Sequence, residues 1–468
     1  MSEIDELYLC PKILKNYIMS TKRIIESLLD VDRYKLTMMQ FIFFFFPNIR
    51  VKYRFKNRTN TPEVNKIMEH LRLFIDMELR HVQTLRFSYS ELQYLSKTGI
   101  FKEEFLNHLS LLRLDNVTVD IVDGELFIEY EGLWSHQILW ETIILSVVNE
   151  LYSRVVALRK YGKDNNLSDS EFYSLFPLVL NGDEEFLNKI VAPYEEEAMR
   201  RLEVKIQEIK HHSSVKFFEF GTRRRFSRLL QEKIIQRLNE AFHKSQFLGA
   251  SQFIGTSNEY MGFKHGLKVG GTMAHEMFMG IAALNRDNDD KLINSTWDFL
   301  RQWNKFYGYD LSVALTDTFG SDWFFKNCPE DIAHMISPRE DSAIDLYKYK
   351  EEVIKLYRKY NINTHEKVIV HSNGLKVLKV VAIENYQHDE INTVYGIGTD
   401  FSCDVGFDYP HISIVIKLAS VYVDKMKQWV DTVKLSDNLA KAIGPKEEVE
   451  YYKGLFGYTV KESVAQEY

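Results

Sequence analysis

The feature that most constrains the fold is a repeated alternation of short apolar runs with turns and helices in the second half of the chain. Each run is followed by a glycine or acidic turn and then by a helical pattern. This alternation is typical of a parallel β/α array, and about eight such runs suit an irregular, TIM-like β/α barrel better than an open sheet. An open sheet stays possible, because a sequence does not show strand order. The runs are residues 215–220, 252–254, 267–269, 312–315, 334–336, 367–370, 393–395 and 412–418.

The first part of the chain mixes helices with strands and predicts a separate α+β domain. Asp30 and Asp32 can cap a helix that carries Tyr34, and residues 51–55 then alternate as a strand. Residues 114–128 predict a hairpin that turns at Asp123-Gly124. We therefore expect an α/β protein with an N-terminal α+β domain at 1–140, on which residues 425–468 pack back, and an irregular β/α barrel domain at 141–424.

A long helical stretch lies between these two parts. Apolar residues recur at helical spacing over residues 140–155, which predicts one long buried helix. Residues 153–212 are charged and helical in pattern, so we expect a helical insertion in the barrel domain there.

Composition excludes several classes of protein. The net charge of −7, with no basic tail or stripe, argues against nucleic-acid binding, although a local group of arginines can still bind a small anion. Cys10, Cys328 and Cys403 show no metal-ligand spacing, which favours a reducing cytoplasm. The aromatic run at residues 41–46 is far shorter than the roughly 20 apolar residues of a membrane span, so we predict a buried helix end and no membrane contact.

One histidine stands out because of its neighbours. His275 follows a glycine pair, between a short apolar run and a helix start. A neutral imidazole is nucleophilic, and small residues beside it let a phosphate group approach. Taken alone, such a histidine is more often a structural residue of a loop, and only its neighbours favour a functional role. Asp317, which follows another predicted strand, could hold one ring nitrogen and leave the other nucleophilic.

Anion-binding residues follow several of the predicted strands, where barrel enzymes carry their chemistry. Three arginines at residues 223–225 follow a strand that ends at Phe220 and open the next helix, which predicts a phosphate site. The turn Tyr-Gly-Ile-Gly-Thr-Asp at 395–400 lets backbone amides approach a phosphate, and the turn at 371–375 is similarly small. Arg339 and Asp341 are two residues apart, so they can hold opposite ends of one ligand.

Six motifs, in the same order, resemble those of nicotinate phosphoribosyltransferases. They lie at residues 28–38, 53–58, 220–227, 255–258, 271–276 and 396–399. The resemblance runs from about residue 27 to about residue 437 and is interrupted by the helical segment 153–212. Six ordered motifs are a strong signal, whereas each alone is weak.

The resemblance implies a two-domain type II phosphoribosyltransferase, as a homodimer whose sites are shared between subunits. The enzyme would join nicotinate to 5-phosphoribosyl 1-diphosphate, releasing nicotinate mononucleotide and diphosphate in NAD biosynthesis, while it hydrolyses ATP. Mg²⁺ would be the cofactor, held mainly by substrate phosphates, with Asp341 as a candidate ligand. The histidine that becomes phosphorylated would be His275.

The resemblance also assigns roles to the other residues. Ser257 favours nicotinate, because family members that use nicotinamide carry an acid there, which would repel a carboxylate. The remaining expected roles are Phe220 and Tyr34 of the partner subunit around the pyridine ring, Arg339 on its carboxylate, Arg223 on diphosphate, Asp341 on the ribose hydroxyls, Gly398 and Thr399 on the 5′-phosphate, and Ser372 and Gly374 in the neighbouring turn.

Two departures from the family pattern keep other functions open. The family pattern is usually Arg-x-Asp-Ser-Gly-Asp-Pro. This chain has Ala343 in place of the glycine, and its next aspartate, Asp345, stands one position later than in the pattern. Asn373 stands where an aspartate is common. The alternatives are a catalytically weakened paralogue that binds nucleotide and acts as a regulatory subunit, and a phosphoribosyltransferase that uses nicotinamide.

Overall fold

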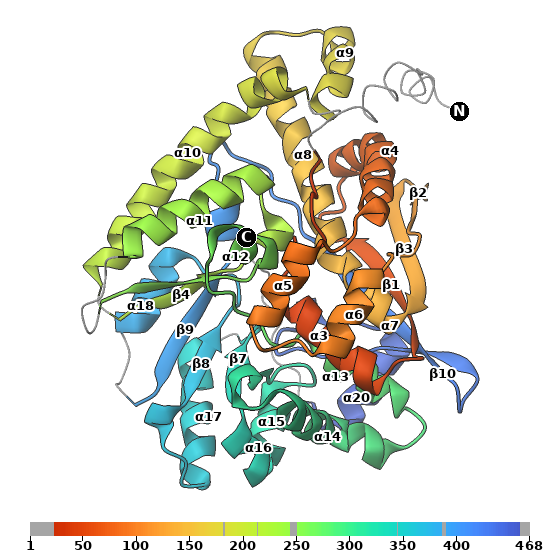
Figure 1. Ribbon diagram of the computed structural model, residues 1–468, viewed down its shortest axis with the longest axis vertical. Coiled ribbons are helices and arrows are strands. Elements are labelled where there is room, and N and C mark those ends of the chain that lie inside the picture. The colour runs from red at the N-terminus through yellow and green to blue at the C-terminus, as the bar shows by residue number, and fades with distance from the viewer. Residues whose placement is uncertain are drawn as a thin grey trace.

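Two β-sheets and the helices around them make up the computed structural model (Figure 1). It describes residues 23–180, 183–212, 214–243, 250–343, 345–385 and 390–458 of the 468-residue chain. Cys10 and residue 344 of the altered turn lie outside the described residues. The main helices are α3 (Arg33–Phe45), α4 (Pro62–Thr84), α5 (Tyr89–Lys97), α6 (Glu103–Leu111), α7 (Trp134–Gln137), α8 (Trp140–Asp164), α9 (Asp169–Leu180), α10 (Glu184–His211), α11 (Arg228–Phe242), α12 (Glu259–His265), α13 (His275–Leu284), α14 (Asp289–Tyr307), α15 (Ser321–Asn327), α16 (Glu330–Met335), α17 (Leu346–Lys359), α18 (Val377–Asn385), α19 (Thr399–Ser402) and α20 (Lys446–Leu455).

The second half of the chain forms a six-stranded parallel sheet, which confirms the predicted α/β class. Its order is β5-β4-β9-β8-β7-β6, so the first strand of the array lies beside the last. The strands are β4 (Lys216–Glu219), β5 (Gln252–Thr256), β6 (Val313–Leu315), β7 (Ser337–Glu340), β8 (Val368–His371) and β9 (Asn392–Ile397).

The two edges of this sheet, β5 and β6, approach each other through the segment that follows β5. Val269 forms a single parallel bridge with Thr256 of β5, and the Thr272 hydroxyl donates to the carbonyl of Val313 in β6, at 2.6 Å. The predicted run 267–269 is thus one bridge rather than a full strand. Closure into a barrel stays a prediction, because β5 and β6 remain the sheet edges.

Two of the predicted strands were misplaced. Residues 334–336 lie at the end of α16, and the strand begins only at Ser337. Residues 412–418 do form a strand, β10 (Ile414–Val423), but it pairs with the antiparallel sheet. Its burial alternates, with Ile414, Ile416 and Leu418 buried, and such alternation is typical of a strand with one solvated face. A central strand of a parallel sheet is instead buried on both faces.

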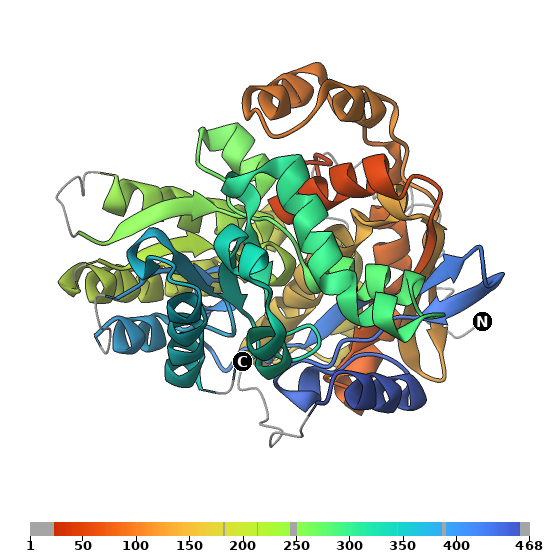
Figure 2. The same ribbon diagram turned by 90° about the horizontal axis from the view of Figure 1, so that it is seen from below.

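The antiparallel sheet has the order β11-β10-β1-β3-β2. It comprises β1 (Arg50–Asn57), β2 (Thr118–Val122), β3 (Glu125–Leu133), β10 and β11 (Gln428–Asp431). The predicted hairpin is confirmed, because Asp123 and Gly124 both adopt positive φ, 51° and 77°, as a two-residue turn of this kind requires. Figure 2 shows the blue β10-β11 hairpin on the side of the molecule opposite the cyan helices. The two predicted domain ranges, 1–140 and 141–424, stay predictions. The antiparallel sheet contains strands from both ranges.

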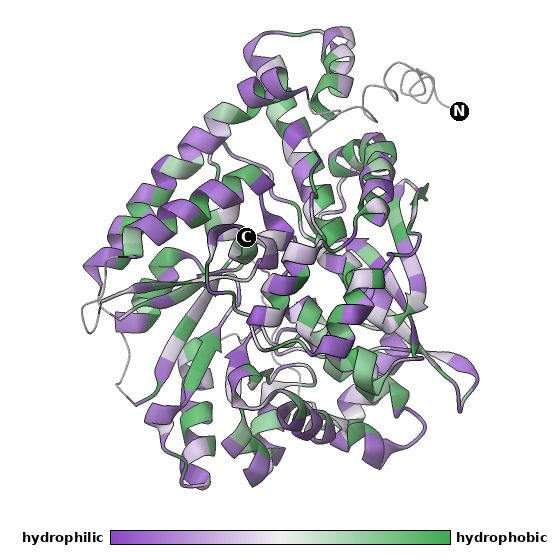
Figure 3. Cartoon of the chain, viewed as in Figure 1, coloured by the Kyte–Doolittle hydropathy of each residue, from purple (hydrophilic) through white to green (hydrophobic). Residues whose placement is uncertain are grey.

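Long helices connect the two sheets. The predicted long helix is α8, which is buried along most of its length and continues through residue 153 without a break. The segment 153–212 is helical as expected, with α9 and α10 following α8. In α10 a stripe of buried residues recurs at every fourth position from Ile190 to Ile206, and its remaining faces are mostly hydrophilic (Figure 3).

The aromatic run ends α3. Phe41 and Ile42 are fully buried, whereas Phe45 is 37% exposed, so only the first half of the run is the buried helix end that we predicted. None of the helices in the described residues combines the length and apolar character that a membrane crossing needs.

Candidate functional site

A cavity of about 560 Å³ opens at the carboxyl ends of the parallel strands, where α/β proteins bind ligands. Its walls bring together most of the residues that the sequence predicted. Ser257 and Asp317 do not line it and lie behind residues near it. The predicted residues that line it are Tyr34, Phe220, Arg223, His275, Arg339, Asp341, Ser372, Gly374, Gly398 and Thr399.

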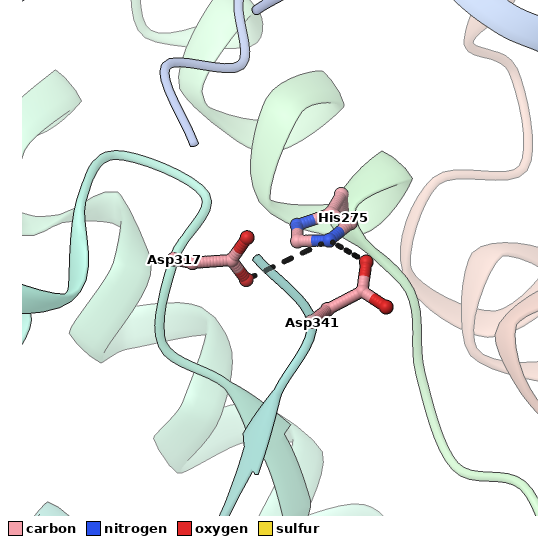
Figure 4. Close-up of side chains that lie close together, drawn as sticks. All are labelled: His275, Asp317 and Asp341. Carbon is pink, nitrogen blue, oxygen red and sulfur yellow. Dashed lines mark hydrogen bonds and ion pairs between the residues drawn. The ribbon is translucent and has the colours of Figure 1, made fainter. Parts of the chain in front are cut away.

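His275 lies between two carboxylates at the first turn of α13 (Figure 4). Its Nε2 is 3.1 Å from Asp341 Oδ2 and 3.6 Å from Asp317 Oδ1. The other ring nitrogen, Nδ1, is 3.0 Å from the Thr318 hydroxyl. We expected Asp317 to hold one nitrogen and free the other, but both carboxylates face the same nitrogen. The second ring nitrogen, Nδ1, therefore faces a hydroxyl and no carboxylate among the described residues.

Two lysines that we did not predict complete this cluster. Lys434 Nζ is 2.9 Å from His275 Nε2 and 3.3 Å from Asp317 Oδ2. Lys441 Nζ donates to the Asp341 carbonyl at 2.7 Å and to Asn373 Oδ1 at 2.8 Å. Both come from the segment after β11. No local motif marks them, and we expected residues 425–468 to pack on the N-terminal domain rather than to contribute to the site.

These neighbours fix the charge states in the cluster. Burial, together with Lys434, lowers the pKa of His275 despite the two carboxylates, which favours the neutral, nucleophilic imidazole. Burial alone would raise the pKa of Asp341, but the contact with His275 and the nearby Lys441 outweigh it and hold this pKa well below its ordinary value. Asp341 is therefore an anion in the cavity wall.

Arg339 and Asp341 extend from the end of β7 as the two-residue spacing predicted. Arg339 Nε donates to the Ser372 hydroxyl at 2.9 Å, and that hydroxyl lies 3.2 Å from Asp341 Oδ1. Asp345 does not replace the missing acid, because it is exposed and caps α17 through the amides of Tyr347 and Lys348.

The three arginines after β4 have two different roles. They lie on a 3₁₀ turn (Thr222–Arg224) and the residue after it, not at the N-terminus of α11, whose cap is Ser227. Arg223 and Arg224 line the cavity. Arg225 instead is fully buried and forms a bidentate pair with Asp30 at 2.7 Å, so it stabilises the fold rather than binding an anion.

Two glycines let aromatic and backbone groups approach closely beside the cavity. A Cβ on Gly396 would lie 2.3 Å from Cδ2 of Phe220, so only glycine leaves room for that ring. Gly271 has φ +140° and packs against the backbone of Tyr34. Tyr34 thus lines the same cavity as Phe220 within one chain, whereas we had predicted Tyr34 of the partner subunit there.

Ser257 acts through another residue. It is buried, and its hydroxyl donates to Asp32 Oδ1 at 2.6 Å. Asp32 occupies the N-cap position of α3, but its side chain makes no capping hydrogen bond, in contrast to our prediction. Its second carboxylate oxygen lies 3.8 Å from Arg223 Nε. Any effect of Ser257 on ligand choice would therefore pass through Asp32 and Arg223.

A buried charge network that the sequence did not reveal supports Arg223. Glu141, at the start of α8, accepts from Arg223 Nη1 at 3.1 Å and from Lys35 Nζ at 2.5 Å. Lys35 is fully buried and also pairs with Glu276, at 2.6 Å. Glu276 is the neighbour of His275 on α13, so the network links the arginine side of the cavity with the histidine side.

His275, Asp317 and Asp341 could also hold a metal ion, because their ligand atoms lie within 4.8 Å of one another. Carboxylate oxygens suit Mg²⁺, which usually takes one or two carboxylates together with substrate phosphates and water. The ammonium of Lys434 already faces His275 and Asp317. Asp341, which lines the cavity, is therefore the residue of this group that best fits Mg²⁺.

The fold and the cavity together are typical of an α/β enzyme whose ligand site lies at the carboxyl ends of its parallel strands. Comparisons with known proteins define it further. Residues 215–460 match the nicotinate phosphoribosyltransferase (NAPRTase) family, and residues 29–149 match the NAPRTase N-terminal domain. The chain therefore belongs to the nicotinate phosphoribosyltransferase family.

Individual relatives agree with this assignment. A nicotinate phosphoribosyltransferase of Methanococcoides burtonii is 32% identical over 438 residues, which cover 92% of this chain and 98% of the relative. The crystal structure of nicotinate phosphoribosyltransferase from Porphyromonas gingivalis is 26% identical, with a TM-score of 0.75, and covers 93% of this chain and 100% of its own. That from Vibrio cholerae is 26% identical, with a TM-score of 0.76, and covers 94% and 96%.

Proposed function

We propose that this chain transfers the phosphoribosyl group of 5-phosphoribosyl 1-diphosphate to nicotinate, with ATP hydrolysed through a phosphate on His275. The products are nicotinate mononucleotide and diphosphate. The observation that carries the proposal is one cavity in which a neutral histidine, flanked by Asp341 and Lys434, faces arginines and glycine turns suited to phosphates. Family membership supports the choice of nicotinate.

The transfer itself breaks the bond from ribose C1′ to the diphosphate oxygen and forms one to the pyridine nitrogen. The diphosphate leaves with the electron pair, and C1′ passes through a state with oxocarbenium character. Such a reaction needs positioning and charge stabilisation more than acid–base chemistry. Tyr34 and Phe220 flank the ring, Arg339 pairs with its carboxylate, and Arg223 stabilises the departing diphosphate.

The sugar phosphate occupies the other polar walls of the cavity. The ribose hydroxyls donate to Asp341, which is ionised and exposed to the cavity. The backbone around Gly398 and Thr399 holds the 5′-phosphate. Mg²⁺, when bound, neutralises the charge of the diphosphate, and Asp341 is the side chain that would hold it.

The ATP step uses the neutral imidazole of His275. The unprotonated ring nitrogen attacks the γ-phosphorus, an N–P bond forms, and the P–O bond to ADP breaks, so that ADP leaves with the electron pair. Water later cleaves the N–P bond and releases phosphate. A phosphate here would be repelled by Asp341 and Asp317, so Lys434 and Lys441 supply the compensating charge. Because the phosphate changes the charge of the cavity wall, it changes the affinity for substrate and product.

A turnover assay tests the activity. Purified protein with labelled nicotinate, 5-phosphoribosyl 1-diphosphate and Mg²⁺ should form the mononucleotide, and ATP should stimulate it. The absence of product both with and without ATP would overturn the proposal. Nicotinamide in place of nicotinate serves as the competing base and should give little product.

A labelling experiment tests the role of His275. Protein incubated with ATP labelled at the γ-phosphate should acquire acid-labile label, and His275→Ala should lose both the label and the stimulation by ATP. His334→Ala is the matched control, because His334 lies exposed on α16 outside the cavity. Label retained in His275→Ala would exclude this residue as the acceptor.

We keep a homodimer as a proposal about assembly, but we infer that each chain carries its own site, since the chain's own Tyr34 lines the cavity. Mixing the inactive variants Tyr34→Ala and His275→Ala distinguishes the two arrangements. A site shared between subunits would regain activity in hybrid dimers, whereas a site within one chain would not. We expect no recovery.

A further inference from the structure

Helix α10, from the segment that interrupts the family resemblance, reaches the cavity that binds the proposed substrates. Glu197, Arg201 and Lys205 recur at every fourth position and so form one row along the helix, beside the buried row of Ala198 and Leu202. Arg201 lines the cavity. This segment therefore contributes a side chain to the site, in addition to its apolar packing.

Both cations of this row bind the segment that follows the glycine turn after β9. Arg201 Nη1 donates to Asp404 Oδ1 at 2.9 Å, and Lys205 Nζ donates to Asp404 Oδ2 at 2.6 Å. Lys205 also lies 3.3 Å from Asp400 Oδ1 and donates to the Asp400 carbonyl. Asp400 directly follows Thr399, the residue proposed to contact the 5′-phosphate, so α10 fixes the end of that turn.

The same segment is tied to two other parts of the site. Asp400 Oδ2 accepts from the amide of Val377, the first residue of α18, at 2.9 Å. The carbonyl of Ser402 accepts from the amide of Phe226, just after the arginine turn, at 2.9 Å. Gly406 lets α10 approach, because a Cβ there would lie 2.7 Å from the side chain of Glu197. Residues 399–406 thus form a junction between α10, α18 and the arginine turn.

Charge explains why cations are needed at this junction. Asp400 and Asp404 both line the cavity beside the glycine turn, where two uncompensated carboxylates would repel a phosphate dianion. Arg201 and Lys205 place two positive charges against them. Lys205 is only 14% exposed, so water screens these pairs less than it screens surface pairs. Arg201 Nε and Nη1 are occupied by Glu197 and Asp404, and among the described residues no partner is found for Nη2.

We propose that Arg201 and Lys205 are positioning residues for the sugar-phosphate end of the substrate: they hold the 399–404 segment in place and neutralise Asp400 and Asp404. This inference rests on the proposed function and deepens it, because it gives the helical segment a role in binding 5-phosphoribosyl 1-diphosphate. Neither residue touches the reacting atoms.

Steady-state kinetics of Lys205→Met test the proposal. The variant should raise the KM for 5-phosphoribosyl 1-diphosphate about tenfold, the effect of losing one favourable charge interaction of moderate strength. The KM for nicotinate and kcat should stay within about twofold. Lys205→Arg should retain the wild-type KM, because it keeps the charge. Adding Asp404→Asn to Lys205→Met should recover most of the loss, since it removes a negative charge that Lys205 no longer neutralises.

Lys233→Met is the matched control. Lys233, on α11, pairs with Glu195 of α10 at 2.5 Å, but it lines no part of the cavity. It should leave all three constants unchanged. If Lys205→Met does not fold, Arg201→Met carries the same test, because Arg201 is more exposed.

The outcomes separate this proposal from the proposed function. An unchanged KM for 5-phosphoribosyl 1-diphosphate in an active, folded variant would overturn the role of α10 and leave the activity standing. Equal losses in kcat and in both KM values, with no recovery by Asp404→Asn, would also overturn it, because they indicate a general structural effect. Wild-type protein that makes no mononucleotide would overturn the proposed function itself.

Discussion

Replacing Glu219 by glutamine should change how the stability of the protein depends on pH. Glu219 is the last residue of β4, directly before Phe220 of the cavity wall, and its side chain is fully buried. The amide of Gly221 donates to it at 2.6 Å and the Thr256 hydroxyl at 2.7 Å. Despite these donors, burial raises its pKa from 4.5 to about 7.

The magnitude follows from that change in pKa. Below pH 4.5 the carboxyl is neutral in the folded and unfolded states, and its contribution to stability is fully present. As the pH rises from 4.5 through about 7, the unfolded chain ionises first, so this contribution is lost. At 1.36 kcal/mol per pH unit the loss reaches about 3 kcal/mol by pH 8. Glu219→Gln cannot ionise and should not lose it.

Urea unfolding of both proteins between pH 5 and pH 8 measures the effect. The free energy of unfolding of Glu219→Gln, relative to wild type, should rise across this range by most of those 3 kcal/mol. Glu240→Gln is the control, since Glu240 is exposed on α11, and it should show no such trend. A difference between Glu219→Gln and wild type that stays constant from pH 5 to pH 8 would refute the reasoning.

Three further changes probe the packing and the charges of the site. Gly396→Ala places a methyl group 2.3 Å from the ring of Phe220, so the KM for nicotinate should rise at least about tenfold with little change in melting temperature. An unchanged KM would show that the Phe220 ring does not contribute to binding nicotinate. Arg225→Met leaves its buried carboxylate partner unpaired and should cost about 3–5 kcal/mol in urea unfolding, whereas a loss below about 1 kcal/mol would contradict the buried pair. Lys434→Met removes a positive charge that lowers the pKa of His275, so the acidic limb of the ATP-stimulated rate should move to higher pH; an unmoved limb would argue against this coupling.

The residues that sequence could predict are those that directly follow a strand. Phe220, Arg339 and Gly398 come from turns after β4, β7 and β9, and the order of a parallel array brings such turns to one edge of the sheet. The local sequence pattern and the predicted fold class were therefore enough to predict that these three residues line the cavity. The same reasoning placed Asp317 beside His275 correctly, but it could not tell which ring nitrogen the carboxylate would face.

The residues that escaped prediction are brought in by long-range packing. Lys434 comes from the segment after an antiparallel strand, Glu141 from the start of α8, and Arg201 from the middle of α10. None stands in a turn with a recognisable pattern, and a single charged residue on a helix is ordinarily a solvated one. Arg225 is an error of the opposite kind. The sequence predicted that it binds an anion, but in the structure it is buried against Asp30.

The pairing of β1 with β10 sets an order for making the protein. Val51 of β1 lies opposite Val421 of β10, so this pair of strands closes a loop of most of the chain. During synthesis the N-terminal sheet leaves the ribosome with one edge of β1 unpaired until residue 423 has emerged. An unpaired strand edge favours association with other chains, and contacts of such sequence separation form slowly. A nascent chain of this protein therefore stays vulnerable to aggregation until nearly all of it has been translated, and fragments ending before β10 should accumulate as insoluble material.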